Sequence, residues 1–132
     1  MNKSYFAKII AKDQHGLQTI SAYCSKSNIK VNEIKYLKKN KIFLLSLQRL
    51  SREFDNSKNK INSILKFEYI NSSRSKNINQ NNTDLIIELL AIDLFKKDHN
   101  YEIRLLFSNN AIITLNAEII EVTLEDQKKI ND

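Results

Sequence analysis

The side chains that most often carry chemistry are few in this sequence and are not spaced as a site. His15 and His99 are the only histidines, and neither stands at a metal-ligand spacing from Cys24 or from paired carboxylates. Cys24 falls on the apolar stripe of an expected helix, where a cysteine is usually a small buried hydrophobic residue. The sequence therefore predicts no metal site, and a Cys–His nucleophilic pair is the less favoured alternative.

Glycine content and the spacing of the acids disfavour two further kinds of site. Loops that bind phosphate through backbone N–H groups need several glycines, whereas Gly16 is the only glycine of the chain. Glu118 and Glu121 fall on opposite faces of an expected strand, so their carboxylates do not converge for acid–base catalysis. We therefore expect no catalytic residue and no cofactor, and we favour a non-enzymatic protein.

Positive charge is concentrated in the first part of the chain. Residues 1–80 contain 16 Lys/Arg and 5 Asp/Glu, whereas residues 81–132 contain 5 and 10, and the net charge is +6. A basic surface of this kind can bind phosphate groups. The candidate contacts to an anion or nucleic acid are Lys35, Lys38, Lys39, Lys41, Arg49 and Arg52. The competing interpretation is a solvated surface in a chain whose composition is biased toward Lys, Asn and Ile.

Arg49 differs from the other basic residues because it ends an apolar strand. An arginine in such a position usually has a fixed partner. Glu118 is the candidate partner, which gives the hypothesis of a buried structural pair between Arg49 and Glu118. The alternative is that Arg49 binds an anionic ligand.

The stretch from Asn100 to Glu125 has the clearest secondary-structure pattern. Apolar and polar residues alternate on both sides of Asn109 and Asn110, which is typical of two strands that are buried on one face. The two asparagines suit a tight turn, because asparagine tolerates positive φ. The alternation changes phase near Glu118, which predicts a bulge or a sharp bend there.

One helix is expected, and it lies near the N-terminus. Asp13 is a favourable N-cap for a helix over residues 14–26. Leu17, Ile20 and Cys24 are spaced to form a narrow apolar stripe on that helix.

About seven strands are expected, and most are joined by short turns. They cover residues 6–11, 29–38, 41–51, 61–72 and 84–95 and the two strands of the hairpin within 100–125, with polar loops at 53–60 and 73–83. Short connections favour antiparallel pairing. The predicted fold class is α+β, in which the N-terminal helix packs on a strongly curved, mainly antiparallel sheet or partial barrel.

Length and composition favour one domain in the cytoplasm. The 132 residues fit a single domain over 1–132, with a core over about 6–126 and a frayed tail at 127–132. No apolar run approaches the roughly 20 residues of a membrane helix. The first 11 residues include Lys3 and Lys8 and no long apolar stretch, which argues against a secretory signal. A single cysteine cannot form an internal disulfide.

Several segments carry a resemblance to a known family. They are the helix from Asp13 through Leu17 and Ile20-Ser21-Ala22, the strand Phe43 to Leu50, Leu65-x-Phe67-x-x-Ile70, Leu89 to Ile92, and Ile113-x-Leu115-x-Ala117-Glu118 followed by Leu124-Glu125-Asp126. In this order, from about Lys8 to Asp126, the chain resembles the bacterial domain-of-unknown-function family 2948. It departs from the family's pattern at Gly16, where a helix former is usual, and at Leu50, where an aromatic residue is usual.

The resemblance implies a compact cytoplasmic domain and supplies no site residue, because the family has no assigned activity. We expect an interaction module that binds a protein partner through a sheet edge or the concave face of the sheet. The alternative is a nucleic-acid-binding domain that uses the basic N-terminal part of the chain. The oligomeric state and the identity of any partner are left open by the sequence.

Overall fold

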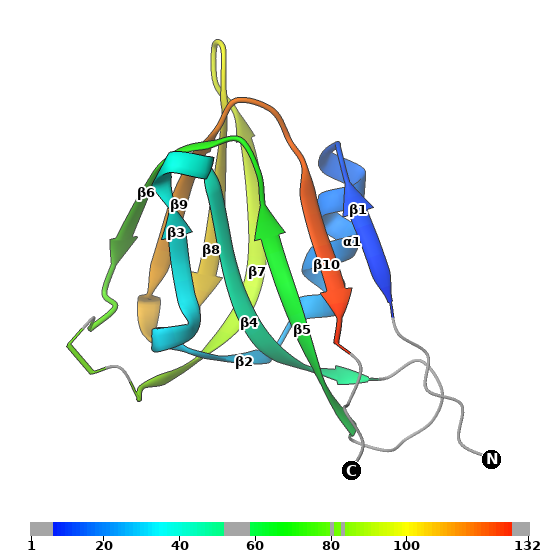
Figure 1. Cartoon of the computed structure of the whole chain (residues 1–132), viewed down its shortest axis with the longest axis vertical. Helices are drawn as coiled ribbons and strands as arrows, with labels where there is room; N and C mark the ends of the chain where they lie inside the picture. The colour runs from blue at the N-terminus through cyan, green and yellow to red at the C-terminus, as the bar shows by residue number, and fades with distance from the viewer. Residues whose placement is uncertain (1–6, 52–58, 80, 83, 128–132) are drawn as a thin grey trace.

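The structure, a computed structural model, describes residues 7–51, 59–79, 81–82 and 84–127 and consists of one α-helix and one large sheet (Figure 1). The helix is α1 (Gln14–Cys24). The strands are β1 (Lys8–Ala11), β2 (Ser27–Lys30), β3 (Ile34–Leu37), β4 (Ile42–Ser51), β5 (Asn59–Phe67), β6 (Ile70–Lys76), β7 (Ile86–Lys96), β8 (Tyr101–Phe107), β9 (Ile112–Ala117) and β10 (Val122–Asp126). The 3-10 turns η1 (Val31–Glu33), η2 (Lys38–Asn40) and η3 (Ser108–Asn110) connect some of them. The predicted α+β class with antiparallel pairing is confirmed.

The expected number of seven strands was wrong, because the described residues form ten. Three of the expected strands are each divided in two. The turn η1 separates β2 from β3, a turn at Glu68–Tyr69 separates β5 from β6, and a bend at Glu118–Glu121 separates β9 from β10. The expected loop at 73–83 begins later than predicted, since β6 continues to Lys76.

The ten strands form a single sheet in which all neighbours pair antiparallel. The strand order is β1-β10-β5-β4-β2-β7-β8-β9-β6, and β3 pairs with β4 beside β2. Figure 1 shows the strands wrapping around a common interior, so that β3 and β6 approach each other. They do not pair with each other, and the sheet therefore does not close into a barrel.

Two connections run side by side between the two halves of the sheet, which are β1-β10-β5-β4 and β7-β8-β9-β6. One leads from β5 to β6 through Glu68 and Tyr69, and the other leads from β9 to β10. The Glu68 N–H donates to the Glu121 carbonyl at 3.0 Å, and the Glu118 N–H donates to the Tyr69 carbonyl at 2.9 Å. These hydrogen bonds satisfy backbone groups that have no partner strand where the chain passes from one half of the sheet to the other.

The bend predicted near Glu118 is confirmed. Leu115 and Ala117 are buried before it, and Ile120 and Val122 are buried after it, although the two pairs have opposite parity in the sequence. The bend therefore turns both sets of side chains toward one core. The hairpin turn is also as predicted, since Asn109 and Asn110 both have φ of 61°.

Helix α1 covers the core between β1 and β7. Asp13 caps the helix as predicted, because its side chain accepts a hydrogen bond of 2.8 Å from the Gly16 N–H. Leu17, Ile20 and Cys24 are all buried, which confirms the apolar stripe. The helix ends earlier than expected, at Cys24, and Lys26 turns the chain into β2 with φ of 68°. In the described ranges, no helix is long and apolar enough to cross a membrane.

Gly16 permits the close approach of α1 to β1. A Cβ atom at this position would lie 3.0 Å from both Cα and Cβ of Ala11. We expect Gly16→Ala to destabilise the protein by about 1 kcal/mol, because overpacking of about 1–3 kcal/mol exceeds the helix-propensity gain of about 1 kcal/mol. Urea unfolding of the natural protein and the variant measures this difference. Ala22→Gly is the control, because it makes the reverse substitution at an exposed position of the same helix. Stabilisation by Gly16→Ala would show that Ala11 moves aside without cost.

Three predictions concern residues that lie wholly or partly outside the described ranges. The polar loop at 53–60 falls largely on residues outside the described ranges, although Asn59 and Lys60 belong to β5. The tail at 127–132 also lies outside them except for Gln127, whose N–H donates to the Asn62 carbonyl at 2.7 Å. Arg52, one of the candidate anion contacts, lies outside the described ranges as well.

Candidate functional site

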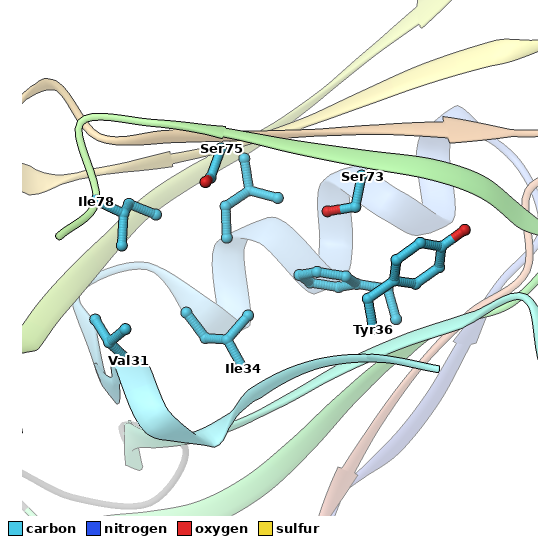
Figure 2. A pocket seen from close by; sticks show the side chains of 8 residues that line it. Val31, Ile34, Tyr36, Ser73, Ser75 and Ile78 are labelled. Atoms are coloured by element: carbon cyan, nitrogen blue, oxygen red, sulfur yellow. The ribbon is translucent and has the colours of Figure 1, made fainter. Parts of the chain in front are cut away.

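The free edges of β3 and β6, which do not pair with each other, flank an apolar cavity. We call this region the seam, defined as the space between β3 and β6. The cavity has a volume of about 370 Å³ and is lined by Val31, Ile34, Tyr36, Phe43, Ser73, Ser75, Ile78 and Ile113. Figure 2 shows side chains from both strands pointing into it. Pockets that bind ligands have a similar size, about 300–1,000 Å³, and a similar mixture of apolar walls and a few polar groups.

Strand register explains which side chains line the seam. Residues directly opposite each other in an antiparallel pair lie on the same face of the sheet. Ile34 and Tyr36 of β3 stand opposite the buried Leu45 and Phe43, so their side chains point inward.

The same register argument applies to β6. Ser73 and Ser75 stand opposite the buried Leu115 and Ile113, so they also point toward the interior. Small hydroxyl side chains at these two inward positions leave room that larger apolar residues would fill. The small serine side chains of β6 therefore contribute to the cavity.

One end of the seam is closed by hydrogen bonds. The Tyr36 hydroxyl donates to the Ile70 carbonyl at 2.9 Å, and the Ile70 N–H donates to the Lys41 carbonyl at 2.8 Å. Tyr36 also packs against Phe43, with ring centroids 6.4 Å apart. These contacts hold the first residues of β6 against η2. Away from that end the two strands are separated by the cavity.

The described basic residues predicted to bind an anion differ in their exposure. Lys35 in β3, Lys38 and Lys39 in η2, and Lys41 between η2 and β4 are exposed. Arg49 is 1% exposed and cannot contact a macromolecule, so its assignment as an anion contact was wrong. Its side chain points inward because β4 alternates, and Arg49 shares the inward parity of Leu45 and Leu47.

Arg49 forms a buried pair with Asp126 in β10. Arg49 Nε lies 2.9 Å from Asp126 Oδ1, and Nη2 lies 2.6 Å from Oδ2. The Ser63 hydroxyl donates to Oδ1 at 2.6 Å, and the Ala7 N–H donates to Oδ2 at 2.7 Å. The Arg49 guanidinium also lies 5.2 Å from the centre of the Tyr23 ring. A buried ion pair requires such a bidentate contact together with further hydrogen bonds to the carboxylate.

The predicted pair between Arg49 and Glu118 was therefore wrong in its partner. Glu118 lies at the bend after β9, where its side chain is 44% exposed and pairs with Lys41 at 2.6 Å. The bend that was predicted at Glu118 turns this side chain outward. Asp126, by contrast, follows the inward residues Val122 and Leu124 at the strand spacing of two.

The buried pair has a structural role and is not accessible to a substrate. Asp126 contacts residues on β4 and β5 and the backbone of Ala7, so it links the C-terminal strand to the centre of the sheet. Cys24 is also buried, and burial raises the pKa of its thiol to about 12 despite the nearby Arg49. The thiol is thus protonated and enclosed, as expected for a core cysteine. Within the described ranges, no three His, Cys, Asp or Glu residues are grouped as for a metal ion.

The environment of Asp126 predicts acid-sensitive stability. Burial raises the pKa of its carboxyl, but hydrogen bonds from Arg49, Ser63 and the Ala7 N–H outweigh burial and hold this pKa below the ordinary value. A depressed pKa in the folded state adds stability that is present above the unfolded value of about 3.9 and is lost as the pH falls through the folded value.

We therefore expect the free energy of unfolding to fall below about pH 4 more steeply in the natural protein than in Asp126→Asn. Urea unfolding at a series of pH values between neutral and strongly acid measures both slopes. Parallel curves would mean that the pKa of Asp126 is the same in the folded and unfolded states.

Comparison with known protein families gives one match. Residues 7–131 match the family described as "Protein of unknown function (DUF2948)". The chain belongs to this family. The match to DUF2948 covers the segments on which the sequence resemblance rested, from the start of β1 to the end of β10. No curated protein and no solved structure matches the chain.

Proposed function

We propose that this DUF2948 protein is a binding module and that the seam takes an extended segment of a partner protein. The observation that carries the proposal is an apolar cavity of about 370 Å³ between two strands, each paired with the sheet on one side only. A strand edge offers backbone hydrogen-bonding groups, and a pocket beside it selects side chains. An added strand supplies both contacts at once.

The inward side chains of the seam indicate what that segment presents to the cavity. Ile34, Phe43 and Ile113 form apolar walls, so a side chain of leucine or isoleucine type is stabilised there by burial. The residues on either side of it along the segment point to the other face, because side chains alternate along a strand. A partner segment thus places every second residue in the cavity.

The nucleic-acid alternative has less support from the geometry. Single-stranded nucleic acid is usually bound by exposed aromatic rings beside basic side chains. Tyr36, the aromatic residue within the basic hairpin, lies in the cavity wall and donates a hydrogen bond to Ile70. Arg49 is buried, and Lys41 is paired with Glu118.

Fluorescence anisotropy with a labelled peptide tests the proposal. A peptide of about six residues that alternates leucine and threonine matches the strand period of two. We expect saturable binding of this peptide and none of a matched serine–threonine peptide, because the second has no apolar side chain for the cavity. Equal binding of both peptides, or binding of neither, would contradict the proposed function.

A further inference from the structure

The outer face of the seam is basic on both sides. Lys35 of β3 stands opposite Leu44, and Arg74 and Lys76 of β6 stand opposite Thr114 and Ile112. By the register argument used above, these three side chains point away from the core, and all three are exposed. Neither β3 nor β6 contains an aspartate or a glutamate.

These three charges have no acidic partner within the part of the chain that the structure describes. Some other surface cations are paired there, since Lys41 lies 2.6 Å from Glu118 and Arg104 lies 2.6 Å from Glu102. Lys35, Arg74 and Lys76 form no ion pair with any residue in the described ranges. Glu33 in η1 is the acidic residue nearest to β3 in the sequence, and its side chain is exposed. The seam therefore combines an apolar interior with an uncompensated basic rim.

We propose that the partner segment alternates apolar with acidic residues, an inference that rests on the proposed function of the seam. A strand placed between β3 and β6 sends its apolar side chains into the cavity and its other side chains to the outer face. There the outward side chain that lies beside Lys35 on one neighbouring strand faces Arg74 or Lys76 on the other. Opposite charges on neighbouring strands attract and fix the register, whereas like charges repel.

Three peptides of equal length separate the two levels of the proposal. Each alternates leucine with a second residue, which is glutamate, threonine or lysine. We expect the leucine–glutamate peptide to bind about tenfold more tightly than the leucine–threonine peptide, and the leucine–lysine peptide to bind most weakly. Raising the salt concentration reduces the advantage of the glutamate peptide, because exposed charges are screened.

A charge-reversal variant supplies the matched control. The triple variant Lys35→Glu, Arg74→Glu, Lys76→Glu is expected to invert the order, so that the leucine–lysine peptide binds most tightly. The triple variant Lys8→Glu, Lys12→Glu, Lys96→Glu makes the same change in net charge at exposed positions outside β3 and β6 and is expected to keep the natural order. Thermal unfolding confirms that both variants fold.

The outcomes distinguish the inference from the proposed function. If the three peptides bind equally, the acidic preference is wrong while the seam remains a peptide site. If no leucine peptide binds, both are wrong. A single-stranded oligonucleotide is the third test. If it competes with the glutamate peptide, and also binds without any peptide through the same three cations, the basic rim belongs to a nucleic-acid surface and the inference is overturned.

Discussion

Replacement of Asp126 by alanine is expected to lower the free energy of unfolding by about 3–5 kcal/mol, which is the usual cost of removing one partner of a buried ion pair. Arg49 would remain 1% exposed and would lose its two hydrogen bonds to the Asp126 carboxylate. The Ser63 hydroxyl and the Ala7 N–H would lose their acceptor as well. Equilibrium unfolding in urea at neutral pH measures the loss.

Glu118→Ala is the control for this prediction. Glu118 also pairs with a cation at 2.6 Å, but the two side chains of that pair are 52% and 44% exposed. Exposed pairs contribute about 0–1 kcal/mol, so the expected loss is small. The shortest contact in both ion pairs is 2.6 Å, so the two variants compare pairs that differ in burial and not in distance. Similar losses in both would show that the burial of Asp126 adds nothing to the strength of its pair.

Ser73→Phe is expected to weaken binding of a leucine-containing peptide by about 10- to 100-fold, the equivalent of burying one leucine side chain. Ser73 points into the cavity from β6, opposite the buried Leu115. A phenyl ring at this position would occupy the space that the peptide side chain fills. Anisotropy titration of the leucine–threonine peptide measures the change.

Ser72→Phe is the matched control on the same strand. Ser72 is exposed and stands opposite Asn116, so it points to the other face of β6. The same added ring outside the cavity is expected to leave peptide affinity within about twofold of the natural protein, as for other exposed substitutions that touch no special feature. Equal loss of affinity in both variants would contradict a cavity that selects the peptide side chain.

The buried pair shows how far parity reasoning can reach. Arg49 was expected to have a fixed partner because it ends an apolar strand, and the structure gives it one. The parity of Val122 and Leu124 extends to Asp126 and would have identified the partner. The phase change at Glu118 favours this residue as the partner, but a bend can turn a side chain outward as well as inward. The direction in which a side chain points at a bend depends on contacts between distant strands, and the local sequence pattern does not contain this information.

The seam could not be predicted for a similar reason. The alternation around Ile34 and Tyr36 and the small inward serines at 73 and 75 are visible in the sequence. Their meeting depends on Tyr69, which takes φ of 60° and sends the chain from β5 to the far end of the strand order. Positive φ is uncommon for a large aromatic residue. No local signal therefore divides the expected strand at this residue.

Amide hydrogen exchange with and without the leucine–glutamate peptide tests the central claim most directly. Exchange reports the protection of backbone N–H groups, which a new strand pairing produces. We predict slower exchange in both β3 and β6 on binding, and no change in β1, which is the other end of the strand order. Protection of β1 alone, or of neither β3 nor β6, would contradict the account of the seam as the binding site.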